Sequence, residues 1–462
     1  MSALLRAGGI AAALATCAGC AAQVAPGPGV PPELVAGANQ AAERIAATSA
    51  RTSDVGWQRL TELVDRYGAR ITGSAALTGA TEWAEGRMRE DGLDAVRLEP
   101  VQVPHWVRGA EWGRVIRPVD QPLVLLGLGG SVGTGGTLRA PMVAFESMDG
   151  LRTSPDRLDG KIAFVNQQMP PYDEERDSPG YAQGVEVRLH AASEAARRGA
   201  VAALVRSVTA VSLRTPHTGA LRYEPGVRKI PAAAVTIEDA DLLARLAREG
   251  PVKIALSLGA RTLPDAPSAN VVGEVAGRTH PDEIVVLGAH LDSWDVGPGA
   301  SDDAAGCIAV MEAMRLLRDA QLEPRRTVRA VLFTGEEYLL AGSRAYAELH
   351  RKDRHVAAFE TDYGMGAPDA IGVGSEERLE ELAPFLPVFA QFGIRRFQPR
   401  AFGADVKPLL DAGAHGFDLE PDGRHYFDVH HSAADTLDVV RPEDLRRNSA
   451  AIALLAYLIA SI

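Results

Sequence analysis

Cysteine is scarce in this sequence: its 462 residues include three, Cys17, Cys20 and Cys307. Because the first two lie in a leader-like segment, the rest of the chain holds a single cysteine and cannot form an internal disulfide. Basic runs long enough to follow a phosphate backbone are also missing, and the net charge is −12. We therefore expect no nucleic-acid partner. The apolar content of 46% is sufficient for a large core, and the length suggests two or three domains.

The N-terminal segment contains an apolar stretch, from Gly8 to Ala15, that is too short to span a membrane. Residues 1–20 carry a basic residue, an apolar stretch and then small residues, which is the pattern of an export signal. The sequence Cys17-Ala-Gly-Cys20 resembles a bacterial lipoprotein box with Cys20 as the acylated residue, although Cys17 replaces the usual leucine. We expect an exported protein, either lipid-anchored or periplasmic in the cell envelope, or secreted after plain cleavage. Residues 21–32, rich in Ala, Pro and Gly, are typical of a linker.

The middle of the chain differs in texture from the parts around it. From 119 to 265, short apolar runs alternate with glycine-rich turns, which predicts a β-rich insert with one helix near 185–198. Strands of the insert are expected at 123–128, 142–145, 161–166, 202–205, 232–236 and 252–258. The flanking residues, 33–118 and 266–462, are expected to form one domain.

This interrupted domain has an α/β pattern. Helices are expected at 54–67 and 75–91, followed by a strand at 94–103. After the insert come expected strands at 284–289, 327–333, 355–361 and 416–419, and expected helices at 303–319, 340–351, 376–392 and 441–461. Such alternation predicts an α/β fold with a mostly parallel mixed sheet flanked by helices. Ligands of such sheets bind beyond the carboxyl ends of the strands.

Histidine and aspartate stand at the end of one strand and the start of the next helix. His290 comes after an apolar run, and Asp292 follows it. A metal-bound imidazole needs its second nitrogen held, and Asp292 is the candidate for that role; a structural, hydrogen-bonded histidine is the alternative. In the pair Asp302-Asp303, one residue is expected to cap the helix while Asp302 binds metal; capping alone is the alternative.

Carboxylates and histidines recur further along the chain. Glu336 and Glu337 follow a buried strand, where adjacent carboxylates are costly without compensating charge. Near a metal, Glu337 would be a ligand and Glu336 would move protons; a solvated loop is the alternative. Asp362 follows another strand and is likewise either a metal ligand or part of a solvated loop. His430 and His431 would point to opposite sides of a strand, so at most one faces a given site.

The sequence strings around these residues resemble those of the co-catalytic zinc exopeptidases, and most closely the carboxypeptidase Q branch, also called plasma glutamate carboxypeptidase. The resemblance rests on His290-Leu-Asp-Ser-Trp-Asp-Val-Gly, Gly-Ala-Ser-Asp302-Asp303, Gly-Glu336-Glu337, Glu360-Thr-Asp362, His430-His431-Ser-Ala-Ala-Asp435-Thr, Tyr67-Gly-Ala-Arg-Ile-Thr-Gly-Ser74 and Leu98-Glu-Pro-Val-Gln-Val-Pro-His-Trp106. It spans most of the chain after the signal. The insert is similar to a protease-associated domain, through more diffuse motifs.

The resemblance implies a role for each matching residue. It implies two zinc ions per chain with five ligands: Asp302 bridging both ions, His290 and Asp362 at one ion, and Glu337 and His431 at the other. His431 is preferred because the family's ligand directly precedes Ser or Thr, although the doubled histidine leaves His430 open. The resemblance also implies a cis peptide between Asp302 and Asp303, and a homodimer.

The expected function is that of a di-zinc metallo-exopeptidase acting on dipeptides or short peptides. A hydroxide bridging the metals would attack, with Glu336 as the general base and Asp292 supporting His290. The same ligands also suit cobalt or manganese. Arg424, His425 and Tyr426, close to the last ligand in sequence, are candidates to line the substrate pocket, with surface or packing roles as the alternative.

Other functions fit the same scaffold. A strict aminopeptidase would share the metal core and differ in the pocket that holds the substrate terminus. A non-catalytic binding protein, as in transferrin-receptor-like relatives, would have lost ligands or the base, and here none is missing. A glutaminyl-cyclase-like reaction is disfavoured because the two-metal set is complete.

Overall fold

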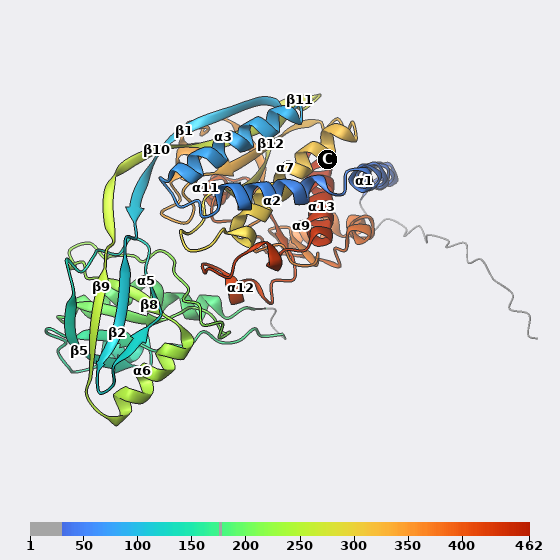
Figure 1. The fold of residues 1–462 in the computed structure, drawn as a ribbon. Coiled ribbons are helices and arrows are strands. Elements are labelled where there is room, and N and C mark those ends of the chain that lie inside the picture. Colours follow the sequence, from blue (N-terminus) through green and yellow to red (C-terminus); the bar gives the residue numbers. More distant parts are fainter. Residues whose placement is uncertain (1–29, 175–177) are drawn as a thin grey trace, which may run out of the picture.

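The computed structural model of the protein describes residues 30–174 and 178–462. The expected export signal, the lipoprotein box and most of the expected linker lie outside the described residues. Within the described part of the chain, no helix is both long and apolar enough to cross a membrane. Two eight-stranded sheets account for the architecture, and Figure 1 shows them as two bodies joined by long strands.

The first sheet is mixed. Its strands, in spatial order, are β1 (Asp94–Val107), β10 (Arg261–Val275), β12 (Arg326–Phe333), β11 (His280–His290), β13 (Arg354–Glu360), β16 (His415–Glu420), β14 (Ala370–Gly372) and β15 (Arg396–Gln398). The central strands β12, β11, β13 and β16 are parallel to one another. Antiparallel pairs flank them, β1 with β10 and β10 with β12 on one side and β14 with β16 on the other. The predicted α/β fold with a mixed sheet is confirmed.

Helices cover both faces of this sheet. One face packs against α3 (Ala75–Glu90), α7 (Ala305–Asp319) and α13 (Pro442–Ser461), and α1 (Pro32–Arg51) and α2 (Val55–Tyr67) pack on these helices. The other face packs against α8 (Ala341–Leu349) and α11 (Lys407–Asp411). In β11, Val285 and Leu287 face the first layer, whereas Ile284 and Val286 face the second. Burial on both faces explains why this strand is a continuous apolar run rather than an alternating one.

Two helices differ from the expectations. Helix α1 has no expected counterpart, because Ala38, Ala41, Ala42 and Ile45 form its buried stripe and alanine contributes little apolar signal. The helix expected at 376–392 is divided into α9 (Glu376–Leu382), α10 (Leu386–Phe389) and the 3₁₀ turns Ala383–Phe385 and Ala390–Phe392. Pro384 and Pro387 account for the division, since proline has no backbone N–H to donate within a helix.

The second sheet is formed by residues 111–258. Its strands, in spatial order, are β3 (Gln121–Leu123), β2 (Glu111–Arg117), β9 (Val252–Leu258), β5 (Leu138–Phe145), β6 (Ile162–Val165), β7 (Ala202–Arg206), β8 (Ala232–Val235) and β4 (Leu125–Gly127). It carries α5 (Tyr181–Arg197), expected at 185–198, and also α4 (Met148–Thr153) and α6 (Ile237–Glu249), which the expected β-rich texture does not include. Strand β2 begins before the expected boundary at 119. The Thr236 hydroxyl, which accepts from the Asp239 amide, is the capping signal of α6.

The two sheets are connected by paired strands that run from one body to the other (Figure 1). β1 continues into β2, and β9 continues into β10, with β1 and β10 antiparallel over most of their length. Where the chain passes between the bodies, a Cβ on Gly109 would lie 2.6 Å from the carbonyl oxygen of Gly259. Gly109 also has a φ of +70°, so this close backbone approach requires glycine twice over.

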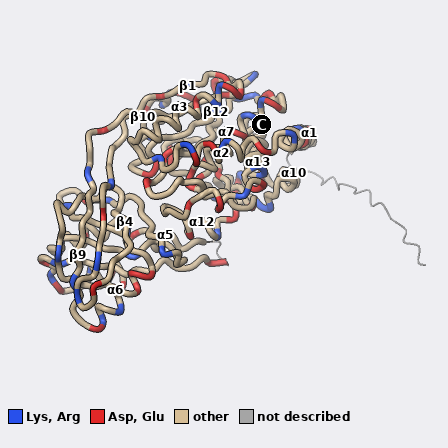
Figure 2. Tube along the Cα trace, in the orientation of Figure 1, with Lys and Arg blue, Asp and Glu red and all other residues tan. Residues whose placement is uncertain are grey.

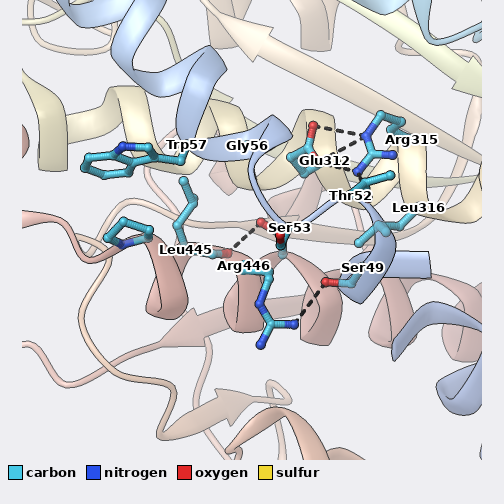
Figure 3. A pocket seen from close by; sticks show the side chains of 12 residues that line it. Ser49, Thr52, Ser53, Gly56, Trp57, Glu312, Arg315, Leu316, Leu445 and Arg446 are labelled. Carbon is cyan, nitrogen blue, oxygen red and sulfur yellow. Dashed lines mark hydrogen bonds and ion pairs between the residues drawn. The ribbon is translucent and has the colours of Figure 1, made fainter. Parts of the chain in front are cut away.

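Charged residues of both signs are interspersed along the chain, as Figure 2 shows. Some of them form ion pairs on α7, where the buried Arg315 lies 2.7 Å from the buried Glu312 and 2.6 Å from the exposed Asp319. A cavity of about 10 Å³ lies beside these ion pairs, near Ser49 and Arg446 (Figure 3). Its size suits about one water molecule. The charged side chains around this cavity are paired with one another, so nothing there indicates a ligand site.

Candidate metal centre

Strand ends of the first sheet bring the predicted ligands together. His290 is the last residue of β11 and pairs in register with Phe333, the last residue of β12. Glu337 follows β12, and Asp362 follows β13, so all three come from the carboxyl ends of adjacent parallel strands. This is the edge at which open α/β sheets bind ligands. The sequence pattern located the edge correctly because strand ends are local features.

The remaining two ligands come from outside the sheet. Asp302 lies in the turn Ala300–Ala304, directly before α7. His431 follows the short helix α12 (Tyr426–Val429), which Figure 1 places between the two sheets. His290, Asp302 and Glu337 are buried, and the side chain of His431 is 8% exposed. The structure therefore brings all five predicted ligands to one place.

Asp302 lies at the middle of the group. Its Oδ1 is 3.4 Å from Nε2 of His290, and its Oδ2 is 3.4 Å from Nε2 of His431. On the first side, Nε2 of His290 is 3.2 Å from Oδ1 of Asp362. On the second side, Nε2 of His431 is 2.9 Å from Oε2 of Glu337. The two oxygens of one carboxylate thus face two separate sets of ligand atoms.

The turn that carries Asp302 is held by Asp435. One oxygen of the Asp435 carboxylate accepts the amide of Ser301 at 2.7 Å, and the other accepts the amide of Asp302 at 3.0 Å. The Asp302–Asp303 peptide is cis, as expected. No role for Asp435 is predicted from the sequence, although its place four residues after His431 was the available signal.

The expectation that one aspartate of the pair caps α7 is wrong. The residue before the helix is Ala304, and no side chain caps it. Asp303 instead turns toward β11, where its Oδ2 accepts the backbone amide of His290 at 3.0 Å. Both aspartates lie in the turn before the helix and face the site. The cap pattern predicts a helix that begins at residue 303, whereas α7 begins two residues later, at Ala305. With His290 and Asp362, Asp303 also forms a group that could hold a metal ion.

Asp292 supports His290, although not through its carboxylate. The backbone carbonyl of Asp292 lies 3.0 Å from Nδ1 of His290, whereas the nearest carboxylate oxygen is 3.8 Å away. A backbone carbonyl is an ordinary partner for the outer nitrogen of a metal-binding histidine. It leaves Nε2 of His290 as the free ligand atom that faces Asp302 and Asp362.

The carboxylate of Asp292 holds the loop that follows β12. Its Oδ1 accepts the amides of Gly335 at 2.8 Å and Glu336 at 3.1 Å, and its Oδ2 accepts the amide of Glu337 at 3.3 Å. The hydroxyl of Thr72 donates to the same carboxylate at 2.8 Å. Asp292 is completely buried, so its charge is stabilised by these four donors.

The two consecutive histidines have different surroundings, although both lie close to Asp302. The rings of His430 and His431 stack, with centroids 3.5 Å apart. His430 packs among aromatic rings, with Tyr181, Tyr426 and Phe427 at 5.2, 5.1 and 5.0 Å between centroids. Its Nε2 is 3.6 Å from Asp302, which is farther than the corresponding atom of His431. His431 alone of the two also contacts a second carboxylate, and this favours it as the ligand.

The charge balance of the site fits bound cations. Burial raises the pKa of Glu337 well above its usual range, and the carboxylate of Asp302 adds to this effect. Burial does the same for Glu336, with a further contribution from Asp362. Burial alone would lower the pKa of His290, but Asp362 and Asp302 raise it well above the usual value. The site therefore holds more carboxylates than its histidine protons can neutralise and has an excess of negative charge. A bound metal ion would neutralise that excess.

Unpartnered oxygens mark where cations would bind. Oδ2 of Asp302 and Oε1 of Glu337 are buried without a hydrogen-bond donor. A cavity of about 10 Å³ is lined by Asp302, Glu337 and His431. Buried carboxylate oxygens without donors are rare in folded proteins. Imidazole nitrogens and carboxylate oxygens are ligands that zinc accepts, so these residues fit the expected metal.

The three candidate pocket residues have different positions. Tyr426 is buried beside Asp302, which raises the pKa of its hydroxyl further after the effect of burial. Arg424 forms an exposed ion pair with Asp422 at 2.9 Å, and the side chain of His425 is 91% exposed. Tyr426 is therefore at the centre, whereas Arg424 and His425 lie on the surface near it.

Comparison with known proteins agrees with this geometry. The sequence profile of peptidase family M28 matches residues 270–456. Carboxypeptidase Q of Mus musculus is 37% identical over 411 residues, which cover 88% of this chain and 86% of that protein. The chain belongs to peptidase family M28. Carboxypeptidase Q of Xenopus laevis is 37% identical over 90% of this chain and 88% of its own length.

Solved structures of family M28 and of related folds superpose on the chain. The crystal structure of a peptidase M28 precursor from Shewanella amazonensis SB2B has a TM-score of 0.88 and 37% identity, covering 93% of this chain and 98% of that one. A zinc aminopeptidase from Bacillus subtilis has a TM-score of 0.65 and 20% identity, over 89% and 95% of the two chains, and supports the fold alone. The predicted resemblance to the carboxypeptidase Q branch is confirmed, and the protein is a metallopeptidase.

Proposed function

We propose that the protein is a di-zinc exopeptidase that hydrolyses dipeptides or short peptides. One observation carries the proposal: the two oxygens of Asp302 face His290 on one side and His431 on the other. A carboxylate placed in this way can bridge two metal ions. Zinc is the metal that the family implies, and the number of two ions follows from the two sets of ligand atoms.

The five ligands divide between the two ions. His290 and Asp362 would hold one ion, Glu337 and His431 the other, and Asp302 both. Two zinc ions, when bound, would supply Lewis-acid activation of the substrate carbonyl and lower the pKa of a shared water. Three ligand carboxylates would offset most of their positive charge. This pairing agrees with the contacts of His290 to Asp362 and of His431 to Glu337.

Glu336 is the proposed general base. Glu336 is less deeply buried than its neighbour Glu337, and its backbone amide is held by Asp292. A carboxylate that is not a metal ligand can take a proton from the attacking water and deliver it to the leaving amine.

Peptides with a free carboxyl end are the proposed substrates. The relatives that align with most of this chain are named carboxypeptidase Q, which supports a carboxypeptidase or dipeptidase. The division into a catalytic domain (33–118 and 266–462) and a protease-associated-like insert (119–265) is also proposed. It is supported by the two separate sheets. Export by the N-terminal signal and lipid attachment at Cys20 remain parts of the proposal that rest on the sequence. A homodimer is also proposed and rests on the family resemblance alone.

Metal analysis tests the proposal directly. The protein is purified without chelator and its zinc is measured by elemental analysis against protein concentration. We expect about two zinc ions per chain. Removal of the zinc with a chelator should abolish peptide hydrolysis, and re-addition should restore it. One zinc ion per chain in fully active protein would contradict the bridging role of Asp302.

A further inference from the structure

The insert contacts the backbone of the proposed metal ligand. Nδ1 of His217 lies 2.7 Å from the carbonyl oxygen of His430. The amide of Thr218 donates to the carbonyl oxygen of His431 at 3.0 Å. Two consecutive carbonyls of the ligand segment are therefore held by two consecutive residues of the insert, more than 200 positions earlier in the chain.

The side chain of His431 faces the same loop. Its Nδ1 lies 3.4 Å from the carbonyl oxygen of Thr218, and Nη1 of Arg188 is 3.2 Å from Nδ1 and 3.5 Å from that carbonyl. For Nε2 of His431 to bind metal, Nδ1 must carry the proton, so Arg188, which can only donate, would donate to the Thr218 carbonyl and not to Nδ1. The Thr218 carbonyl is the acceptor available to that proton, and such outer-nitrogen partners orient metal-binding histidines.

His217 is itself rigidly placed. It is 2% exposed, and its backbone amide donates to the hydroxyl of Ser207 at 2.9 Å. The Ser207 hydroxyl donates to the carbonyl of Val235 at 2.7 Å, which ties the loop to the end of β8. Because the partner of His217 is a carbonyl oxygen, its Nδ1 must be the donor. Burial lowers the pKa of His217 to about 4, so the ring is neutral and that nitrogen carries its one proton.

The backbone of His431 needs external support. Its φ is +58°, in the left-handed region that side-chain-bearing residues seldom adopt. Residues in this region persist when the surrounding structure over-determines them, and they concentrate at functional sites. The hydrogen bonds from His217 and Thr218 lie on the two carbonyls at either side of this conformation. Both hydrogen bonds come from the insert. The other four proposed ligands lie at or just after the ends of strands of the first sheet, or in the turn before α7.

We infer that His217 is a positioning residue of the insert, which sets the affinity of the metal site at His431 and leaves the site at His290 unchanged. The inference rests on the proposed two-metal site. His217 would contact neither metal nor substrate, and it would act through the backbone of His430 and His431. The insert would thereby be required to complete the metal centre and would not be a passive appendage.

Metal titration of two variants tests this inference. Metal-free full-length protein is titrated with Zn²⁺ in the presence of a competing chromophoric chelator, which reports both dissociation constants. His217→Leu removes the donor, and we expect one of the two constants to rise by about 10–100-fold. His217→Asn should restore it to within about threefold of wild type, because the asparagine amide nitrogen can occupy the place of Nδ1.

Matched variants separate positioning from general damage. His355→Leu removes another histidine whose pKa burial lowers to about 4, at the opposite end of the first sheet, and both constants should stay at wild-type values. If His217→Leu does not fold, Ser207→Ala, which removes the anchor of the His217 amide, should raise the same constant by a smaller factor. Unchanged constants in the folded variant, or equal losses in His217→Leu and His217→Asn, would overturn the inference. Wild-type protein that binds fewer than two zinc ions would instead contradict the proposed function.

Discussion

The carboxylate of Asp292 accepts the backbone amide of Glu336 at 3.1 Å. The same residue holds His290 through its backbone carbonyl at 3.0 Å. Asp292 therefore links one proposed metal ligand to the loop that carries the proposed base. The backbone carbonyl of Asp292 contacts His290, and its carboxylate holds the Glu336 loop. A substitution of the side chain should therefore affect the loop and leave the contact with His290 in place.

Asp292→Ala tests that separation. The variant loses the acceptor for three loop amides but keeps the carbonyl that faces His290. We expect kcat to fall by about 10–100-fold, because the base is no longer held in place, while the metal site at His290 is retained. Steady-state kinetics and zinc analysis measure the two effects. Asp292→Asn, which keeps one acceptor oxygen, should lose less activity, and a wild-type kcat in Asp292→Ala would show that the loop needs no such support.

Glu336→Gln tests the role of the base. The amide has nearly the same shape but cannot take a proton, so we expect turnover to fall by about 10²–10⁴-fold with both zinc ions still bound. Single-turnover kinetics and elemental analysis check this outcome. Glu348→Gln, on the exposed face of α8, serves as the control and should be fully active. Turnover at the wild-type rate in Glu336→Gln would assign proton transfer to another group.

Asp302→Ala tests the shared ligand. Because both ions would lose a ligand at once, we expect the purified variant to contain well below one zinc per chain. Asp362→Ala should instead weaken the one ion that shares His290. Elemental analysis after dialysis against a weak zinc buffer distinguishes the two variants. Retention of two zinc ions by Asp302→Ala would refute the bridge.

A panel of blocked dipeptides tests which substrate terminus is recognised. The panel contains free dipeptides, the same peptides with an acetylated amino group, and the same peptides with an amidated carboxyl group. We expect the amidated peptides to resist cleavage, in keeping with the carboxypeptidase Q relatives. Cleavage of the amidated peptides combined with loss of cleavage on acetylation would assign the protein as a strict aminopeptidase.

The pH dependence of stability is predicted for an ion pair away from the centre. Burial alone would lower the pKa of His350, but the hydrogen bond from its Nε2 to Glu99 at 2.9 Å and the contact with Asp353 raise it. Arg329 opposes this rise. Because the folded state holds the proton more tightly, the stabilisation is full below about pH 6.5. It is lost as the pH rises through the folded-state pKa of His350.

His350→Leu measures this contribution. The variant should unfold with a free energy about 1 kcal/mol lower than wild type at pH 6, and the difference should shrink by pH 9. Urea unfolding at both pH values, with zinc present throughout, gives the two differences. The same difference at pH 6 and at pH 9 would show that packing, and not the charged hydrogen bond, accounts for the loss.

Much of the fold and of the site could be predicted because the signals are local. The apolar run before His290 identifies a strand buried on both faces, and the carboxylates after neighbouring runs identify the binding edge. Helix α1 escaped prediction because an alanine stripe, such as Ala38 to Ala42, has little contrast with its polar face. The cap prediction failed at Asp303, because capping and metal-site turns use the same residue type at the same place in the chain.

Residue types and their spacing along the chain were enough to identify the family and to predict a ligand set and a base. They did not predict three contacts: the hydrogen bond that the Glu336 amide donates to Asp292, the packing of His430 among aromatic rings, and the support of the His431 backbone by His217. Every residue has a backbone carbonyl and amide, so a contact made through them leaves no pattern in the amino-acid letters. Such contacts exist only once the strand order and the docking of the insert have brought distant segments together.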